Sequence, residues 1–283
     1  MPARQPPREI QPSHRRELLD TAVRAALDGG RIVSRNHDPL GQELIRKGTG
    51  DFVTAVDLEV EDLLRKTILE QWPEHGFLGE EHPPHALDAD FVWVVDPIDG
   101  TSNFGRGLGT FAVSVACLYR GAPLATAVHC FPEDVTYHAA LDLGAFRGTQ
   151  RLELAATSID DSAILGLQWH RGVQQLPYIE DLLSTGSRIR NLGCTVVQLC
   201  DVATGRLDGN VQEQGRLWDF AAAALLVTEA GGRFTSWAGD DIFPVPTLEG
   251  VGHLPSIAAH PSIHGSLCEL LGPWQDRLDV PPR

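Results

Sequence analysis

Residues 93–104, with the sequence WVVDPIDGTSNF, constrain this chain more than any other segment. The apolar run from Phe91 predicts a short buried strand ending at Asp96, and open α/β sheets place ligand sites at the carboxyl ends of their strands. Pro97 restricts Asp96 to an extended backbone and fixes its own φ angle, so the chain must turn. The turn returns Asp99 to the same region. The segment therefore predicts two carboxylates at one end of a buried strand.

The residues around these carboxylates suit both a cation and an anion. Two carboxylates with a backbone carbonyl between them are ligands that Mg²⁺ prefers. Gly100 lets the backbone approach a ligand closely, and we expect Thr101 to cap a short helix whose free N–H groups would hold an anion. An Asp-Pro turn explains an isolated Asp-x-x-Asp pair in most proteins, whereas the complete string predicts a binding site.

Two other segments supply carboxylates of the same kind. Glu80 and Glu81 follow a short predicted strand, and Asp219 lies at the start of a strongly apolar helix. Taken separately, the first is typical of a solvated turn and the second of a helix N-cap. Together with residues 93–104 they predict a cluster of acidic ligands.

This combination resembles the inositol monophosphatase family of metal-dependent sugar-phosphate phosphatases. Residues 93–104 and 218–232 resemble the two signatures of the family, and Lys47 to Asp57 and Gly79 to Glu81 resemble two further elements, all in the family's order. The resemblance implies an α/β fold with two subdomains, in a layered αβαβα sandwich of the inositol monophosphatase and fructose-1,6-bisphosphatase type.

The resemblance also implies a metal site. Glu80, Asp96 and the carbonyl of Ile98 would hold one Mg²⁺ ion. Asp96, Asp99 and Asp219 would hold a second, with Asp96 bridging the two. The family pattern allows a third, weaker ion near Glu80.

The remaining implied roles concern water and phosphate. Asp57 and Thr101 would orient and deprotonate the attacking water, close to the catalytic carboxylate of Glu80. The backbone N–H groups of Gly100 and Thr101, together with Ser102, would hold the phosphate of the substrate.

The sequence departs from the family pattern at the residue expected to contact the sugar of the substrate. True inositol monophosphatases have a glutamate that contacts the sugar hydroxyls seven residues before the second-signature aspartate. Here that position is Gln212, with Glu213 beside it, so either the carboxylate has become an amide or the loop has shifted by one residue. Cys194 lies where family members line the substrate pocket, and Lys47 would lie in a mobile loop, residues 47–51, that closes near the metals.

Net charge limits the partners. The 283 residues include 23 Lys and Arg against 38 Asp and Glu, a formal charge of −15, whereas nucleic-acid-binding proteins present a basic face. The same charge would repel an anionic substrate, but bound Mg²⁺ reverses the local sign. The densest apolar stretch, residues 220–227, is far shorter than the roughly 20 residues that span a bilayer. Five scattered cysteines and the absence of an export signal predict a cytoplasmic protein with reduced thiols. The fold resemblance suggests a homodimer.

Apolar periodicity and turn signals predict the organisation of the chain. We expect a disordered leader over residues 1–12, an N-terminal half over 13–150 with most metal ligands, and a C-terminal half over 151–283 with Asp219. One predicted helix follows Ser13, which would cap it, and a second opens at Thr54 or Asp57. Further helices are predicted over residues 173–183, 194–204, 218–230 and 262–271. The predicted strands cover residues 77–78, 91–95, 111–119 and 124–130.

We therefore expect a Mg²⁺-dependent phosphatase that hydrolyses a small phosphomonoester, an inositol phosphate or a related sugar or polyol phosphate, by attack of a metal-activated water. Within the same fold, histidinol phosphate, fructose 1,6-bisphosphate and a nucleotide 3′-phosphate are alternative substrates. A non-catalytic regulatory binding protein on the same fold is the alternative from another class.

Overall fold

The computed structural model describes residues 10–38, 41, 43–48, 51–131, 133–169, 177–275 and 277. Most of the predicted leader, residues 1–9, lies outside this range, as do residues 173–176 of a predicted helix. The helices are α1 (Pro12–Asn36), α2 (Ala55–Gln71), α3 (Thr101–Gly105), α4 (Pro177–Ser184), α5 (Thr195–Ala203), α6 (Leu217–Glu229) and α7 (Pro261–Gln275).

The larger sheet has seven strands, which pair in chain order. They are β3 (Gly76–Gly79), β4 (Phe91–Asp99), β5 (Phe111–Tyr119), β6 (Ala122–Phe131), β7 (Val135–Ala140), β8 (Gly144–Arg147) and β9 (Gln150–Arg151). Strands β3 and β4 are parallel, and the other neighbours are antiparallel. Every residue of β5 is buried, because helices cover both faces of the sheet at its centre.

The smaller sheet has five strands in the order β11-β10-β12-β14-β13. They are β10 (Ile164–Gln168), β11 (Arg188–Arg190), β12 (Gly209–Gly215), β13 (Arg233–Thr235) and β14 (Leu254–Ala259). Strand β10 is parallel to both of its neighbours, and the other pairs are antiparallel. The change from one sheet to the other falls between Arg151 and Ile164. The predicted division into two halves near residue 150 stays a prediction.

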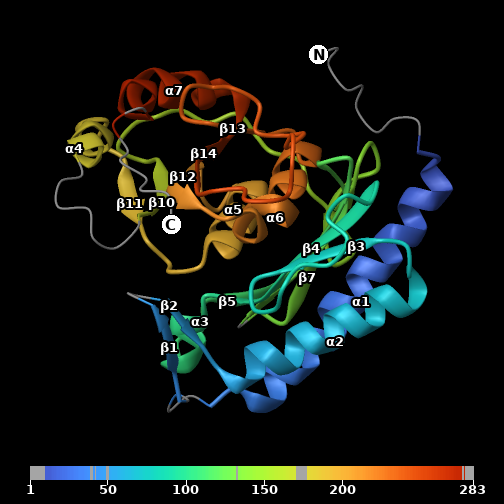
Figure 1. Ribbon diagram of the computed structural model, residues 1–283. Helices are drawn as coiled ribbons and strands as arrows, with labels where there is room; N and C mark the ends of the chain where they lie inside the picture. The colour runs from blue at the N-terminus through green and yellow to red at the C-terminus, as the bar shows by residue number, and fades with distance from the viewer. Residues whose placement is uncertain are drawn as a thin grey trace.

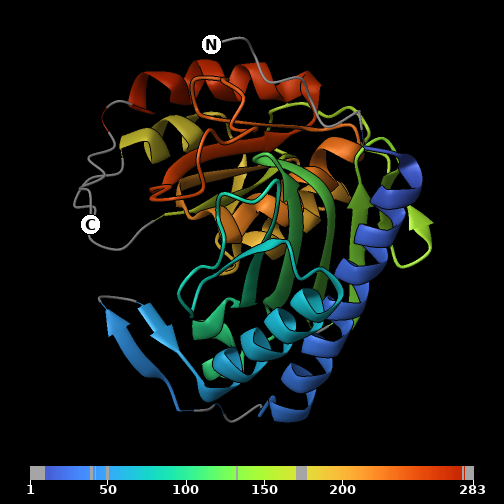
Figure 2. The same ribbon diagram turned by 45° about the vertical axis from the view of Figure 1, so that its right-hand side comes forward.

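The elements stack in five layers, which confirms the predicted αβαβα order. Helices α1 and α2 cover one face of the larger sheet, α5 and α6 lie between the two sheets, and α4 and α7 cover the outer face of the smaller sheet (Figures 1 and 2). No helix in the described part of the chain has the length and apolar content for a membrane crossing.

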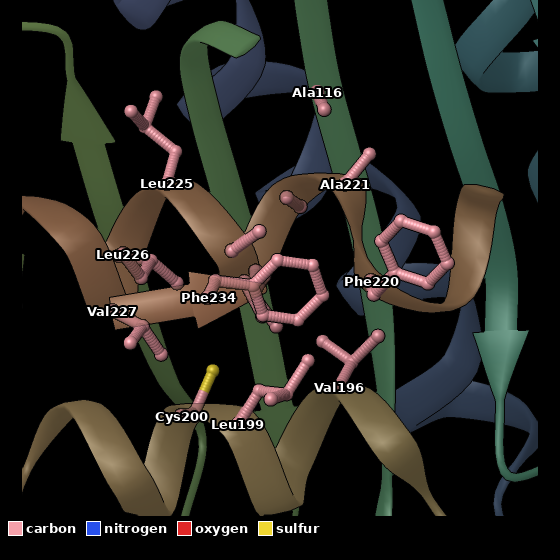
Figure 3. Packing of buried hydrophobic residues seen from close by; sticks show 14 of the residues in the cluster. Ala116, Val196, Leu199, Cys200, Phe220, Ala221, Leu225, Leu226, Val227 and Phe234 are labelled. Carbon is pink, nitrogen blue, oxygen red and sulfur yellow. The ribbon is translucent and has the colours of Figure 1, made fainter. Parts of the chain in front are cut away.

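The middle layer forms the core that joins the two sheets. Helix α6 is apolar around its whole circumference, as expected for a helix buried on all sides. Figure 3 shows Phe220 of α6 next to Val196 of α5, with Phe234 of β13 beside them and Ala116 of β5 near Ala221 at the top of the view. This packing holds the start of α6 next to the carboxyl end of β4.

The start of α1 and the segment around Lys47 differ from the sequence prediction. Ser13 was predicted to cap the first helix, but α1 begins at Pro12 with Gln11 as its N-cap, because proline fits the first helical position, where no N–H is needed. Lys47 was expected in a mobile loop, but it lies on β1 (Ile45–Gly48), which pairs with β2 (Asp51–Val53) as an antiparallel ribbon. Residues 49–50 of that segment lie outside the described ranges.

Candidate active site

Asp96 and Asp99 lie on either side of a bulge in β4. Between them β4 contains one more residue than the partner strand β5. A bulge bends the strand and re-aims its side chains, and it accommodates Pro97, which cannot donate a ladder hydrogen bond. Oδ1 of Asp96 accepts the N–H of Ile98 at 3.0 Å. The strand was predicted to end at Asp96, but it continues to Asp99 and carries both carboxylates.

The short helix α3 begins directly after this bulge. Gly100 is its N-cap and has a φ of 89°, where a Cβ would lie 2.9 Å from the carbonyl oxygen of Thr110. Thr101 was predicted to be the cap, but it is the first helical residue. Its Oγ1 lies 2.9 Å from the carbonyl oxygen of Ile98 and 3.1 Å from Oδ1 of Asp57. A hydroxyl carries one proton, so Thr101 donates to one of these acceptors at a time.

Asp57 is held by a capping box at the start of α2. Thr54 is the N-cap, and Oδ2 of Asp57 accepts the N–H of Thr54 at 2.9 Å. Of the two predicted helix starts, the structure therefore has Thr54. Burial raises the pKa of Asp57, while the hydrogen bonds from Thr54 and Thr101 lower it.

Glu80 follows β3, and its carboxylate is paired with a lysine from the β1–β2 ribbon. Nζ of Lys47 lies 3.0 Å from Oε1 of Glu80 and 2.8 Å from Oε1 of Glu81. Burial opposes the charged form of Lys47, but the two glutamates raise its pKa above the ordinary value. The ribbon thus places one positive charge beside the predicted metal ligand.

Asp219 comes from the other half of the chain, in the first turn of α6. Its Oδ2 accepts the N–H of Arg216, the N-cap residue, at 2.8 Å. Asp219 is therefore the third helical residue and not the cap itself, so the same carboxylate can start the helix and face the site.

These elements meet at a cleft of about 260 Å³, just below the range of roughly 300–1,000 Å³ that is usual for small-molecule sites. Nine of the predicted residues line it: Glu80, Asp96, Ile98, Asp99, Gly100, Thr101, Ser102, Gln212 and Asp219. The other three touch this set: Asp57 contacts Thr101, Lys47 contacts Glu80, and Cys194 contacts Asp99.

Buried negative charge dominates the cleft. Burial raises the pKa of Asp96 well above its usual range, and the charges of Glu80, Asp99 and Asp219 raise it further. Burial also raises the pKa of Asp99 to about 6, although the hydrogen bond from Cys194 lowers it. In the same way burial raises the pKa of Glu80 to about 7, although the charge of Lys47 lowers it. Burial and the charges of Asp99 and Glu80 raise the pKa of Asp219.

The chemistry of this donor set fits a hard divalent cation. The converging side chains are all carboxylates, and Mg²⁺ binds oxygen ligands while keeping several waters. Within the described ranges, no three Asp, Glu, His or Cys side chains are arranged to hold an ion as they stand. The fit therefore rests on the mutual repulsion of buried carboxylates, which a bound cation relieves.

Cys194 supports Asp99 instead of lining the cleft. Its Sγ donates to Oδ2 of Asp99 at 3.0 Å, and the N–H of Val196 donates to the same oxygen at 2.6 Å. Burial and the charge of Asp99 hold the pKa of the Cys194 thiol well above its ordinary value, so the thiol keeps its proton. The start of α5 thus fixes one oxygen of Asp99.

Strand β12 decides between the two candidate specificity residues. Gln212 and Gln214 line the cleft, and side chains alternate along a strand, so Glu213 points to the opposite face. There Glu213 interacts with Tyr178. The amide of Gln212 is held by Thr195, whose Oγ1 lies 3.3 Å from Nε2. An amide therefore occupies the position next to the carboxylate cluster.

The sequence did not single out several other residues of the cleft, among them Phe52, Gln168, Trp169, Gln214, Arg216 and His253. One signal was present: Gln212 and Gln214 have the two-residue spacing of one strand face. Gln168 carried no such signal, because it is brought to Gln212 only by the parallel pairing of β10 with β12.

Comparisons with known proteins show which sequences and structures this chain is similar to. The sequence profile of the inositol monophosphatase family matches residues 14–272. The Nus factor SuhB of Salmonella typhimurium is 34% identical over 229 residues, which cover 78% of this chain and 86% of that protein. The inositol-1-monophosphatase of Mesorhizobium japonicum is 33% identical over 226 residues, which cover 77% and 85%.

The solved structures include SaIMPase-II of Staphylococcus aureus with inositol monophosphate bound. It has a TM-score of 0.77 and 28% sequence identity, and the match covers 93% of this chain and 96% of that one. The same protein is also described with 2′AMP bound, at a TM-score of 0.75, 27% identity and coverage of 94% and 97%.

Proposed function

Because this chain belongs to the inositol monophosphatase family, we propose that it is a Mg²⁺-dependent phosphatase that hydrolyses a small phosphomonoester. The observation that carries the proposal is the cleft itself. Four carboxylates from three separate segments share it, of which Asp96 is buried and the other three are partly buried, and the Asp57–Thr101 pair lies at its edge. Phosphoryl transfer needs positioning and charge neutralisation more than covalent work by side chains.

The carboxylates divide into two ligand sets that share one member. Glu80, Asp96 and the carbonyl of Ile98 would hold one Mg²⁺ ion, and Asp96, Asp99 and Asp219 would hold a second. A third, weaker ion would bind near Glu80. When bound, the ions supply positive charge that neutralises the phosphate and lowers the pKa of the attacking water.

The chain's own residues orient the reactants. Asp57 accepts a hydrogen bond from the Thr101 hydroxyl. Thr101 would in turn orient the attacking water and relay a proton from that water to the carboxylate of Asp57. The backbone N–H groups of Gly100 and Thr101, with Ser102, would bind the phosphate oxygens. Lys47 forms ion pairs with Glu80 and Glu81 and so keeps the β1–β2 ribbon next to the site.

The substrate is a small phosphorylated molecule whose leaving group lies near Gln212. A carboxylate accepts hydrogen bonds from two hydroxyls, whereas an amide has one acceptor oxygen and one donor group. Gln212 therefore disfavours inositol 1-phosphate and keeps related sugar phosphates, histidinol phosphate, fructose 1,6-bisphosphate and nucleotide 3′-phosphates as candidates. The relative that binds both inositol monophosphate and 2′AMP supports a search across these classes.

The setting of the enzyme follows from the family resemblance and the thiols. We place it in the cytoplasm, since all five cysteines are free and four of them are buried. The homodimer is what the family resemblance suggests. The net charge of −15 weighs against a nucleic-acid polymer as partner.

A second candidate function is a non-catalytic regulatory protein on the same fold. The relative with 34% identity is named as a Nus factor and not as a phosphatase. The complete site favours catalysis, because a protein that binds only a partner has no chemical need for both the ligand set and the Asp57–Thr101 pair.

One experiment separates the two functions. Phosphate release from a panel of phosphomonoesters is measured with Mg²⁺ and with EDTA, for the wild type and for Asp99→Asn. We expect Mg²⁺-dependent release by the wild type and none by a folded Asp99→Asn variant. Absence of release from every substrate would favour the regulatory function.

A further inference from the structure

Glu61 is a buried carboxylate on α2 that contacts the loop carrying Glu80. Its side chain is 0% exposed. Its Oε2 accepts the N–H of Glu81 at 2.8 Å, and its Oε1 accepts the N–H of His82 at 2.9 Å. The two backbone N–H groups that follow Glu80 are therefore bound to one side chain.

The contact continues on both sides of Glu80. A Cβ on Gly79 would lie 2.1 Å from Oε1 of Glu61, so the end of β3 packs directly against the carboxylate. Nδ1 of His82 lies 3.2 Å from the same oxygen. One turn further along α2, Arg65 donates to the carbonyl of Pro83 at 3.2 Å. Helix α2 thus contacts the loop from Gly79 to Pro83.

The same helix also carries Asp57. Residues four apart lie on one face of a helix, so Asp57 and Glu61 are successive members of one row. Asp57 holds Thr101 from this row, while Glu61 holds the backbone next to Glu80. One rigid element therefore connects the predicted water-orienting pair to the predicted metal ligand.

We propose that Glu61 is a positioning residue that sets the orientation of Glu80 towards the cleft. A buried carboxylate that accepts two backbone N–H groups forms charge-assisted hydrogen bonds, which are stronger than neutral ones. Groups that orient a ligand in this way typically affect metal affinity by about 10–100-fold when they are replaced. The proposal rests on the proposed function only in taking Glu80 as a metal ligand.

Glu61→Gln is the direct test, because the amide has the shape of the carboxylate. Its oxygen can accept one N–H, while its NH₂ group opposes the other. Calorimetric titration of the metal-free full chain with Mg²⁺ is expected to give a dissociation constant on the order of 10–100-fold higher than that of the wild type. We expect faster hydrogen exchange of the Glu81 and His82 amides, and a kcat near the wild-type value at saturating Mg²⁺.

Glu59→Gln is the matched control. Glu59 is exposed on the same helix, and its replacement removes the same charge without touching the loop. We expect wild-type Mg²⁺ affinity and wild-type amide exchange. An equal loss of affinity in both variants would assign the effect to net charge and overturn the proposal.

Three further outcomes separate the proposal from a purely structural role and from the proposed function. If Glu61→Gln lowers only thermal stability and binds Mg²⁺ like the wild type, the role of Glu61 is purely structural and the proposal is wrong. If that variant does not fold, Gly79→Ala is used, since its Cβ displaces the carboxylate of Glu61 and is expected to weaken Mg²⁺ binding in the same way. A wild type that binds Mg²⁺ but releases no phosphate would overturn the proposed function, while Mg²⁺ affinity still tests Glu61.

Discussion

The hydroxyl of Thr101 lies 3.1 Å from Oδ1 of Asp57, which joins α3 to the first turn of α2 at the edge of the cleft. When Thr101 donates its proton to Asp57, its oxygen keeps lone pairs that accept a hydrogen bond from water. Burial raises the pKa of Asp57 and so makes this carboxylate a better proton acceptor than an exposed one. The pair can therefore orient a water and take up its proton.

Replacing Thr101 by valine tests this pair. Valine keeps the shape of threonine but has no proton to donate, so we expect kcat to fall by about 10²–10⁴-fold, the usual contribution of a positioned acid–base group. Mg²⁺ affinity measured by calorimetry is expected to stay the same. Thr101→Ser, which keeps the hydroxyl, is the control and should retain most activity. Wild-type turnover by the valine variant would rule out the proton-relay role.

Replacing Asp96 by asparagine tests the charge cluster. Burial and the neighbouring carboxylates raise the pKa of Asp96, so without metal its charge is unfavourable. We expect the metal-free variant to unfold at a higher temperature than the metal-free wild type, by about 2–4 °C for each 1 kcal/mol of repulsion removed. Mg²⁺ at 100 times its dissociation constant should stabilise the wild type by about 2.7 kcal/mol and the variant much less.

The control for this experiment is Asp88→Asn, at an exposed acidic residue away from the cleft. It removes the same charge and should leave both the metal-free stability and the response to Mg²⁺ unchanged. An Asp96→Asn variant that Mg²⁺ stabilises as strongly as the wild type would contradict the assignment of Asp96 as the shared ligand.

Replacing Gln212 by glutamate tests substrate selection. Gln212 lines the cleft, so a carboxylate there would accept hydrogen bonds from vicinal hydroxyls. We expect the ratio of kcat/KM for inositol phosphate to kcat/KM for a nucleotide phosphate to rise about tenfold, equivalent to about 1.4 kcal/mol. Glu213→Gln, on the opposite face of β12, should leave the ratio unchanged. An unchanged ratio in Gln212→Glu would mean that this side chain does not select the substrate.

His75 gives the fold a pH dependence that is separate from the cleft. It is buried and stacked between Trp72 and Phe91, and its Nδ1 accepts the indole N–H of Trp93 at 3.0 Å. Burial, aided by the positive charge of His14, lowers the pKa of His75 to about 4. The unfolded chain binds this proton near pH 6.5, so the stabilising contribution is complete above pH 6.5 and is lost as the pH falls towards 4.

The variant His75→Gln isolates this contribution, because its carbonyl oxygen can accept the Trp93 N–H at any pH. Free energies of unfolding are compared by urea titration at pH 7 and pH 5. Every other group titrates in both proteins, so its effect cancels in the difference. We expect the free energy of unfolding of the variant, taken relative to that of the wild type, to be higher at pH 5 than at pH 7 by on the order of 1 kcal/mol. A difference that does not change with pH would show that His75 titrates normally in the folded state.

Local patterns were enough for the elements whose signal lies within a few residues. Strand β5 was predicted over residues 111–119 and is found there, because an unbroken apolar run bounded by turns is typical of a strand covered on both faces. No strand of the smaller sheet was predicted. Strand β11 has only three residues, and it pairs with β10, a strand from a separate part of the sequence, so no local pattern indicates the pairing.

The sequence and its family resemblance predicted the residues of the site: the acidic residues Asp57, Glu80, Asp96, Asp99 and Asp219, the glycine at the turn, and their order along the chain. These features depend on residue types and on their order, which a sequence displays directly. Only the tertiary structure decided which neighbours act on them. It placed Gln212 and not Glu213 at the cleft, and it placed Cys194 and Glu61 as supports of Asp99 and of the backbone after Glu80. The reason is that strand register and helix packing set the facing of a side chain, and both arise from contacts between segments far apart in the chain.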